Sequence, residues 1–106
     1  MTTFDDREKA FEDKFRHDED VLFRVRVRRD TLAGLWAAGL MGMNAAEAQA
    51  YARRIVEVDI GTPGPHDIRD RLSADLHAKG IDISDHRVER EMGRLLDLAR
   101  RQVNAE

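Results

Sequence analysis

The sequence of 106 residues contains no cysteine, two prolines, one tryptophan, one tyrosine and four phenylalanines. The absence of cysteine excludes a disulfide framework and a thiolate metal site. No apolar run approaches the length of about 20 residues that spans a bilayer, and the charged beginning lacks the apolar centre of a secretory signal. We therefore expect one soluble, cytoplasmic domain that is stabilised by packing alone and does not insert into a membrane.

The polar residues form none of the common catalytic or metal-binding patterns. The glycine- and proline-rich segment 61–65 lacks the lysine and the preceding strand of a phosphate-binding loop. Ser73 and Ser84 have neither a glycine elbow nor a base partner. No metal-ligand spacing relates the four histidines, which are His17, His66, His77 and His86. We predict that the chain is not an enzyme and uses neither a cofactor nor a metal.

Hydrophobic spacing and capping signals predict an all-α fold. The expected helices cover residues 20–42, 45–59, 65–79 and 85–104. In the last three helices the predicted inward positions are Ala48, Tyr51, Ile55 and Val58, then Ile68, Leu72 and Leu76, and then Val88, Met92, Leu95 and Ala99 flanked by Leu96 and Val103. Asn44 with Glu47 has the spacing of an N-terminal capping pair, Gly80 is a left-handed stop, and Ser84 is the N-cap of the last helix. Amphipathic helices joined by short connections bury their apolar faces most economically as an antiparallel four-helix bundle.

The first bundle helix carries two competing patterns. Helical spacing predicts an inward face formed by Leu22, Val25, the stem of Arg29, Leu32, Trp36 and Leu40. Trp36 should anchor the core, because it is the largest apolar side chain. In residues 21–28, valine and phenylalanine also alternate with leucine and arginine, which is the period of a strand. We favour the helix, because a lone strand would leave its backbone groups unpaired.

Residues 1–20 form a distinct, highly charged arm that precedes the predicted bundle of residues 21–106. Twelve of the sixteen positions from 5 to 20 are charged, and residues 1–20 hold eight acidic and four basic groups. A segment this polar cannot fold alone, so we expect it to be helical only conditionally. Yet Phe4, Phe11 and Phe15 share one helical face, which suits the groove of a partner. The alternative is that the arm packs back as a continuation of the first bundle helix.

A short basic cluster follows the arm and consists of Arg24, Arg26, Arg28 and Arg29. Such a cluster can meet phosphate or an acidic protein surface. A solvated helix face is the more common reading of scattered arginines on a globally acidic domain. The acidic arm also argues against a nucleic-acid partner.

Several segments resemble the zeta subunits of alphaproteobacterial F-type ATP synthases. The sequence TFDDREKAFE at residues 3–12, followed by Lys14-Phe15 and His17-Asp18-Glu19, is similar to the opening of that family. Further similar segments follow in the same order, namely GLWAA at 34–38, Tyr51-Ala52, Gly80, Ser84-Asp85-His86, Met92, Leu95 and Leu96. The resemblance therefore spans essentially the whole chain.

This resemblance implies a small four-helix inhibitor of ATP hydrolysis, located in the cytoplasm at the membrane-bound ATP synthase. Its N-terminal helix would enter a catalytic interface between the alpha and beta subunits, against the gamma rotor. The matched contact residues are Phe4, Asp5, Arg7, Phe11 and Phe15. The alternative function is a regulatory or assembly module of the same complex that binds ADP or ATP weakly.

Overall fold

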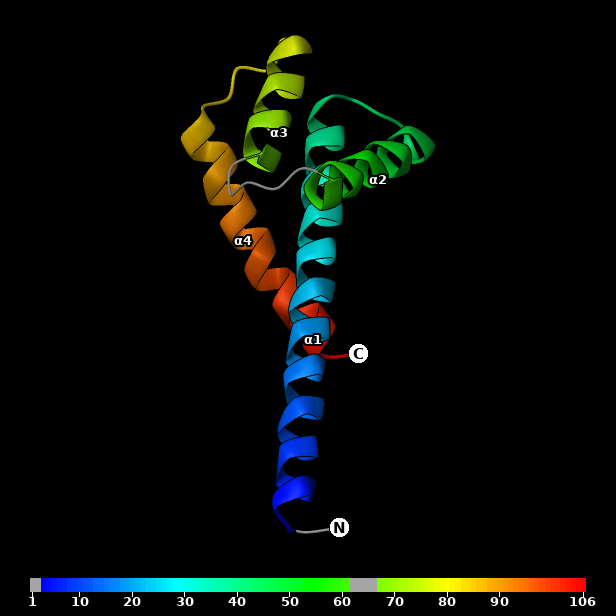
Figure 1. The fold of residues 1–106 in the computed structure, drawn as a ribbon. Helices are drawn as coiled ribbons and strands as arrows, with labels where there is room; N and C mark the ends of the chain where they lie inside the picture. The colour runs from blue at the N-terminus through cyan, green and yellow to red at the C-terminus, as the bar shows by residue number, and fades with distance from the viewer. Residues whose placement is uncertain (1–2, 62–66) are drawn as a thin grey trace.

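The protein is described by a computed structural model in which the backbone of residues 3–61 and 67–106 and the side chains of residues 5–61 and 67–106 are placed. Within these residues the fold consists of four helices and no strand (Figure 1). They are α1 (Thr3–Leu40), α2 (Ala45–Gly61), α3 (Asp67–Ala78) and α4 (Asp85–Asn104). The predicted all-α, four-helix class is confirmed.

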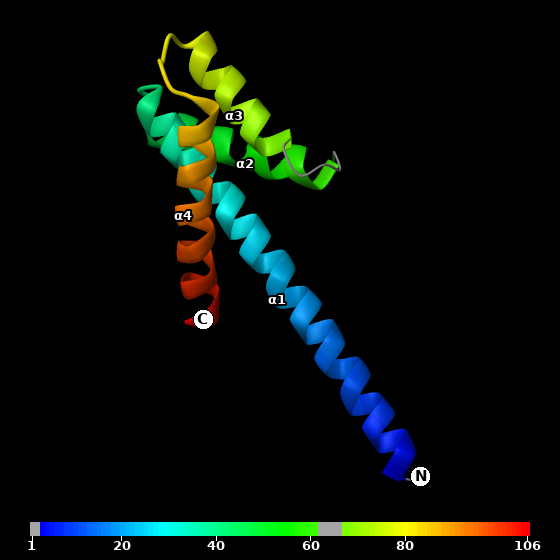
Figure 2. The same ribbon diagram turned by 90° about the vertical axis from the view of Figure 1, so that its left-hand side faces the viewer.

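Helix α1 is much longer than the others and runs without a break through residue 20, the predicted boundary between arm and bundle. Its 38 residues correspond to a length of about 57 Å. The first half of α1 projects away from the other helices (Figures 1 and 2). The described residues consequently extend over 64 × 26 × 22 Å, with a radius of gyration of 17.5 Å. A compact chain of this length would have a radius of gyration of about 13 Å.

The second half of α1 packs against α2 on one side and α4 on the other, and α3 lies between the upper parts of α2 and α4 (Figures 1 and 2). The period-two alternation of residues 21–28 therefore lies in a helix. The core confirms most of the predicted inward positions on α2, α3 and α4. These buried residues are Tyr51, Ile55, Ile68, Leu72, Leu76, Val88, Leu95, Ala99 and Val103.

The inward face of α1 differs from the predicted one. Leu22 and Leu40 are exposed, and Trp36 is only partly buried at the edge of the core. The predicted central role of Trp36 was therefore wrong. Small residues take the inner positions instead, namely Ala33, Gly34, Ala37 and Ala38. The reason is that α1 and α2 approach closely, so a large side chain on this face has no room between the two backbones.

The predicted helix ends are confirmed by their hydrogen bonds. Asn44 and Glu47 bond each other reciprocally, with Asn44 N donating to Glu47 Oε1 at 3.0 Å and Glu47 N donating to Asn44 Oδ1 at 2.9 Å. The hydroxyl of Ser84 accepts from Arg87 N at 3.1 Å. Gly80, with a φ of 78°, ends the α3 segment in the left-handed conformation. These local bonds satisfy backbone groups that the helix itself leaves unpaired.

Three helix ends differ slightly from the expected ones. Helix α1 ends at Leu40 rather than residue 42, α2 continues to Gly61 rather than residue 59, and α3 ends at Ala78 rather than residue 79. The expected start of α3 at Pro65 lies outside the described residues. In the last turn of α2 the backbone carbonyl of Asp59 accepts a hydrogen bond from Arg26 Nη2 at 3.2 Å, which satisfies one of the carbonyl groups that a helix end leaves unpaired.

Candidate partner-binding surface

The first half of α1 presents large apolar side chains that no other helix covers. Phe11 is 73% exposed, Phe15 57% and Leu22 67%. Helical periodicity places these three positions on one face. The chain leaves this apolar stripe uncovered, which is unusual for large side chains at helical spacing in a small domain.

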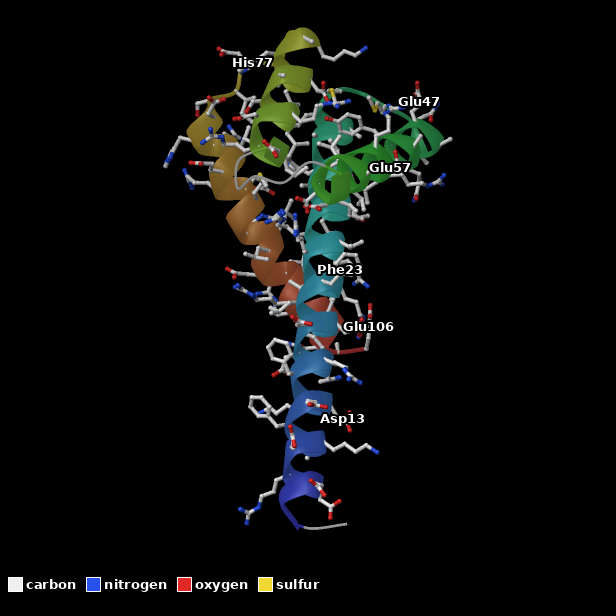
Figure 3. All side chains as sticks on the ribbon, in the orientation of Figure 1. Asp13, Phe23, Glu47, Glu57, His77 and Glu106 are labelled. Carbon is white, nitrogen blue, oxygen red and sulfur yellow. The ribbon has the colours of Figure 1, made fainter. Side chains whose placement is uncertain are left out.

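The five residues implied by the family resemblance all lie on this projecting half. Asp5 and Arg7 are exposed in the first turns of α1, and Phe11 and Phe15 follow one turn apart. The backbone of Phe4 belongs to α1, but its side chain lies outside the described residues. Figure 3 shows the surroundings of this segment, where the charged side chain of Asp13 projects into solvent. The arm is therefore an aromatic stripe bordered by charges.

The arm meets the bundle where α1 passes the end of α4. Val25 is buried against Ala99 and Val103 of α4, and Val21 and Leu96 pack at the edge of this cluster. These contacts begin about five turns into α1, so α4 packs against α1 near the middle of the long helix. The first turns of α1 are left to be stabilised by local interactions alone.

Glu106, which follows α4, adds hydrogen bonds to this contact between α1 and α4. Glu106 accepts a hydrogen bond from Arg24 Nη2 at 2.7 Å and a second one from Arg28. Arg28 also donates through Nη1 to Gln102 Oε1 at 2.9 Å. The hydrogen bonds to Glu106 lower the pKa of this carboxyl, Arg28 having the larger effect. A groove beside this contact is lined by Phe23, Val27 and Val103, and Figure 3 labels Phe23 and Glu106 near the end of α4.

Two more arginines of the basic cluster bind carboxylates between α1 and α2. Arg26 donates from Nε to Asp59 Oδ2 at 2.6 Å and from Nη2 to Asp59 Oδ1 at 2.7 Å. Arg29 donates from Nη2 to Asp30 Oδ1 at 2.8 Å. All four arginines of the cluster are thus engaged with carboxylates of the chain itself. These interactions join α1 to α2 and to the C-terminal end of the chain.

Sequence reasoning did not find the buried polar groups of the bundle. Asp30 and Asp59 lie in the α1–α2 contact, and Tyr51 donates its hydroxyl proton to Asp75 Oδ2 at 2.7 Å. Burial, followed by this hydrogen bond, raises the pKa of Tyr51. A signal for Asp59 was present, because it follows the inward residues Tyr51 and Ile55 at i+8 and i+4. Because a charged side chain is rarely buried, the spacing alone did not lead to the prediction that Asp59 faces inward.

Two other kinds of site, a metal cluster and a membrane span, are not found in the described residues. In residues 3–61 and 67–106, no group of three histidine or acidic side chains is placed to hold a metal ion. His77 Nε2 is 2.7 Å from the carbonyl oxygen of Ile83, which is a local structural contact. Within the same ranges, no helix is long and apolar enough to cross a membrane. The exposed stripe of the arm is the outstanding candidate for function.

Comparisons with known proteins found a matching family model and a solved structure of similar fold. The family model described as ATPase inhibitor subunit zeta matches residues 1–102. The chain belongs to this zeta-subunit family. A structure solved by solution NMR also matches with 30% sequence identity and a TM-score of 0.68, covering 78% of this chain and 94% of the other. A comparison with curated proteins found no significant match.

Membership of the zeta family supports an inhibitory, regulatory role for the chain. It also implies an interaction with the ATP synthase. The match begins at residue 1 and therefore includes the projecting arm as well as the bundle.

Proposed function

We propose that this zeta-family protein inhibits ATP hydrolysis by inserting the first half of α1 into a catalytic interface between the alpha and beta subunits, against the gamma rotor. Phe4, Asp5, Arg7, Phe11 and Phe15 are the contact residues. The observation that carries the proposal is the exposure of Phe11 and Phe15, at 73% and 57%, on a helix that the bundle does not cover.

The energetics favour binding of the arm in an apolar groove. Each phenylalanine that becomes fully buried contributes about 1.5–3 kcal/mol. Ordering a helix costs about 1–2 kcal/mol for each backbone residue, so a free arm of this polarity has little stability of its own. A partner that covers the stripe supplies the missing burial, as in other helix-in-groove complexes.

The bundle fixes the position of the arm. Helix α4 packs against α1 around Val25, and Arg24 and Arg28 of the same segment bind Glu106. The segment before this contact with α4, residues 3–20, is about 27 Å long as a helix. This length sets how far the arm can enter before the bundle meets the surface of the enzyme.

The proposal is tested by the ATP hydrolysis rate of the isolated catalytic head of the ATP synthase, titrated with the full-length protein. Phe11→Ala combined with Phe15→Ala should weaken inhibition at least tenfold and leave the unfolding transition of the bundle unchanged. Phe23→Ala is the matched control, because Phe23 is 51% exposed on α1 but lies outside the stripe. Inhibition by the double variant equal to that of the control would contradict the role of the stripe.

Co-purification of each variant with the catalytic head separates binding from inhibition. If the double variant still binds but no longer inhibits, the bundle contributes affinity and the arm acts as the wedge. If the double variant inhibits as well as the original chain, the arm is not the inhibitory element.

A further inference from the structure

Two buried carboxyl groups meet where α1 packs against the last turns of α2. Asp30 is 1% exposed and Asp59 is 4% exposed. The same nitrogen, Arg29 Nη2, lies 2.8 Å from Asp30 Oδ1 and 3.7 Å from Asp59 Oδ2, so the two carboxyl groups are neighbours. Two adjacent buried carboxylates repel each other, and each also loses its hydration. The surroundings of this pair must therefore compensate for the burial of two carboxyl groups.

The neighbouring cations compensate the two carboxyls unequally. Asp59 is held by the paired donors of Arg26, so both of its oxygens accept a hydrogen bond. Only Oδ1 of Asp30 has a donor, which is the guanidinium of Arg29 at 2.8 Å and 3.1 Å from Nη2 and Nε. The second oxygen, Oδ2 of Asp30, is buried without a hydrogen-bond partner. A proton on Asp30 would convert this orphan acceptor into a donor toward Asp59.

We propose that Asp30 and Asp59 share one proton and form a proton-binding site that stabilises the packing of α1 against α2. In the protonated state Asp30 donates to the Asp59 carboxylate, and Arg26 holds Asp59 from its other side. When the proton is lost, two buried carboxylates face each other and one oxygen has no donor. Proton binding thereby becomes part of the stability of the bundle.

The charged groups around the pair come from α1 and α2. Arg26 and Arg29 belong to α1 together with Asp30, and Arg29 Nη2 also lies 3.7 Å from Asp59 Oδ2. On the α4 side of this part of α1, Ala99 and Val103 pack against Val25, and Arg28 binds Gln102 and the Glu106 carboxylate. Helix α3 begins with Asp67, a carboxyl that also has a buried, unpartnered oxygen. Asp67 is therefore the natural control for the pair.

The titration of the pair follows from these surroundings. Burial, followed by the hydrogen bond with Asp59, raises the pKa of Asp30 to about 7. Burial acts to raise the pKa of Asp59 as well, but hydrogen bonds from Arg26 and Asp30 outweigh it and lower this pKa to about 2. Because the raised pKa belongs to Asp30, its contribution to stability is complete below about pH 4, the unfolded value, and is lost as the pH rises through 7.

The experiment measures urea unfolding of the full chain from pH 4.5 to 8.5, together with the carboxyl carbon resonance of Asp30 in a ¹³C-labelled sample. The unfolding constant of the original chain should rise by up to about tenfold per pH unit below pH 6.5 and level off above pH 7.5. Asp30→Asn keeps a donor toward Asp59 without a titrating proton, so this rise should be absent. Asp67→Asn should follow the original chain.

The proposal is overturned if Asp30→Asn shows the same pH dependence as the original chain. It is also overturned if the Asp30 carboxyl titrates below pH 5. The resonance measurement uses the unmodified protein, so it decides the question even if Asp30→Asn fails to fold. A titration midpoint near neutral pH together with a flattened Asp30→Asn profile supports the proton site.

Discussion

Replacing Gly34 by alanine should destabilise the bundle, although alanine is the better helix former. A Cβ at position 34 would lie 2.7 Å from the Cα and 3.1 Å from the Cβ of Ala52. Carbon atoms in favourable contact are about 3.5–4.0 Å apart, so α1 and α2 would have to separate. Overpacking of this kind costs about 1–3 kcal/mol, whereas the gain in helix propensity is about 1 kcal/mol. The expected net effect is a loss of up to about 2 kcal/mol in the free energy of unfolding.

The matched control is Gly93→Ala in the middle of α4. A Cβ at Gly93 would meet nothing within 4 Å, and Gly93 is exposed. Only the gain in propensity applies there, so the control should be stabilised by up to about 1 kcal/mol. Urea unfolding followed by circular dichroism at 222 nm measures both variants under identical conditions. Equal stabilisation of the two would refute the close approach of α1 and α2 at Gly34.

Two further changes test local contacts by the same unfolding assay. Ser84→Ala removes the hydroxyl that accepts from Arg87 N at 3.1 Å, and loss of such a cap costs about 1 kcal/mol; a loss below the experimental error would mean that water replaces the cap without cost. Tyr51→Phe removes the hydroxyl that donates to Asp75 at 2.7 Å, with an expected loss of about 1 kcal/mol. Arg71 Nε also donates to Asp75, at 2.8 Å, so a loss well above this value would mean that Arg71 does not compensate for the missing hydroxyl.

The helices and most of their ends were predictable because their signals are local. The Asn44–Glu47 pair, the left-handed Gly80 and the Ser84 cap act on backbone groups within a few residues. The inward positions of α2, α3 and α4 followed from their spacing, since each helix has a single apolar face. Helix α1 was the exception, because its apolar residues occur on several faces and its partner helix determines which face is buried.

The position of the candidate site could be predicted from the sequence, but the contacts that attach it to the bundle could not. The stripe of Phe11 and Phe15 could be recognised from spacing within a charged segment, and both side chains are exposed. The hydrogen bonds at the base of the arm could not be recognised, because Arg24 and Arg28 bind Glu106, which lies about 80 positions away in the sequence. The matching of charges over such separations depends on the packing of α4 against α1.

The sequence by itself determined four helices, their caps and a charged arm with an aromatic stripe. These features depend on periodicity and on hydrogen bonds between near neighbours. Only the tertiary structure decided that Gly34 lies against Ala52, that Trp36 stays at the edge of the core, and that Asp30 and Asp59 are buried beside the same arginine, Arg29. The physical reason is that burial and electrostatic pairing depend on how closely two helices approach, and this distance is set jointly by side chains far apart in the chain.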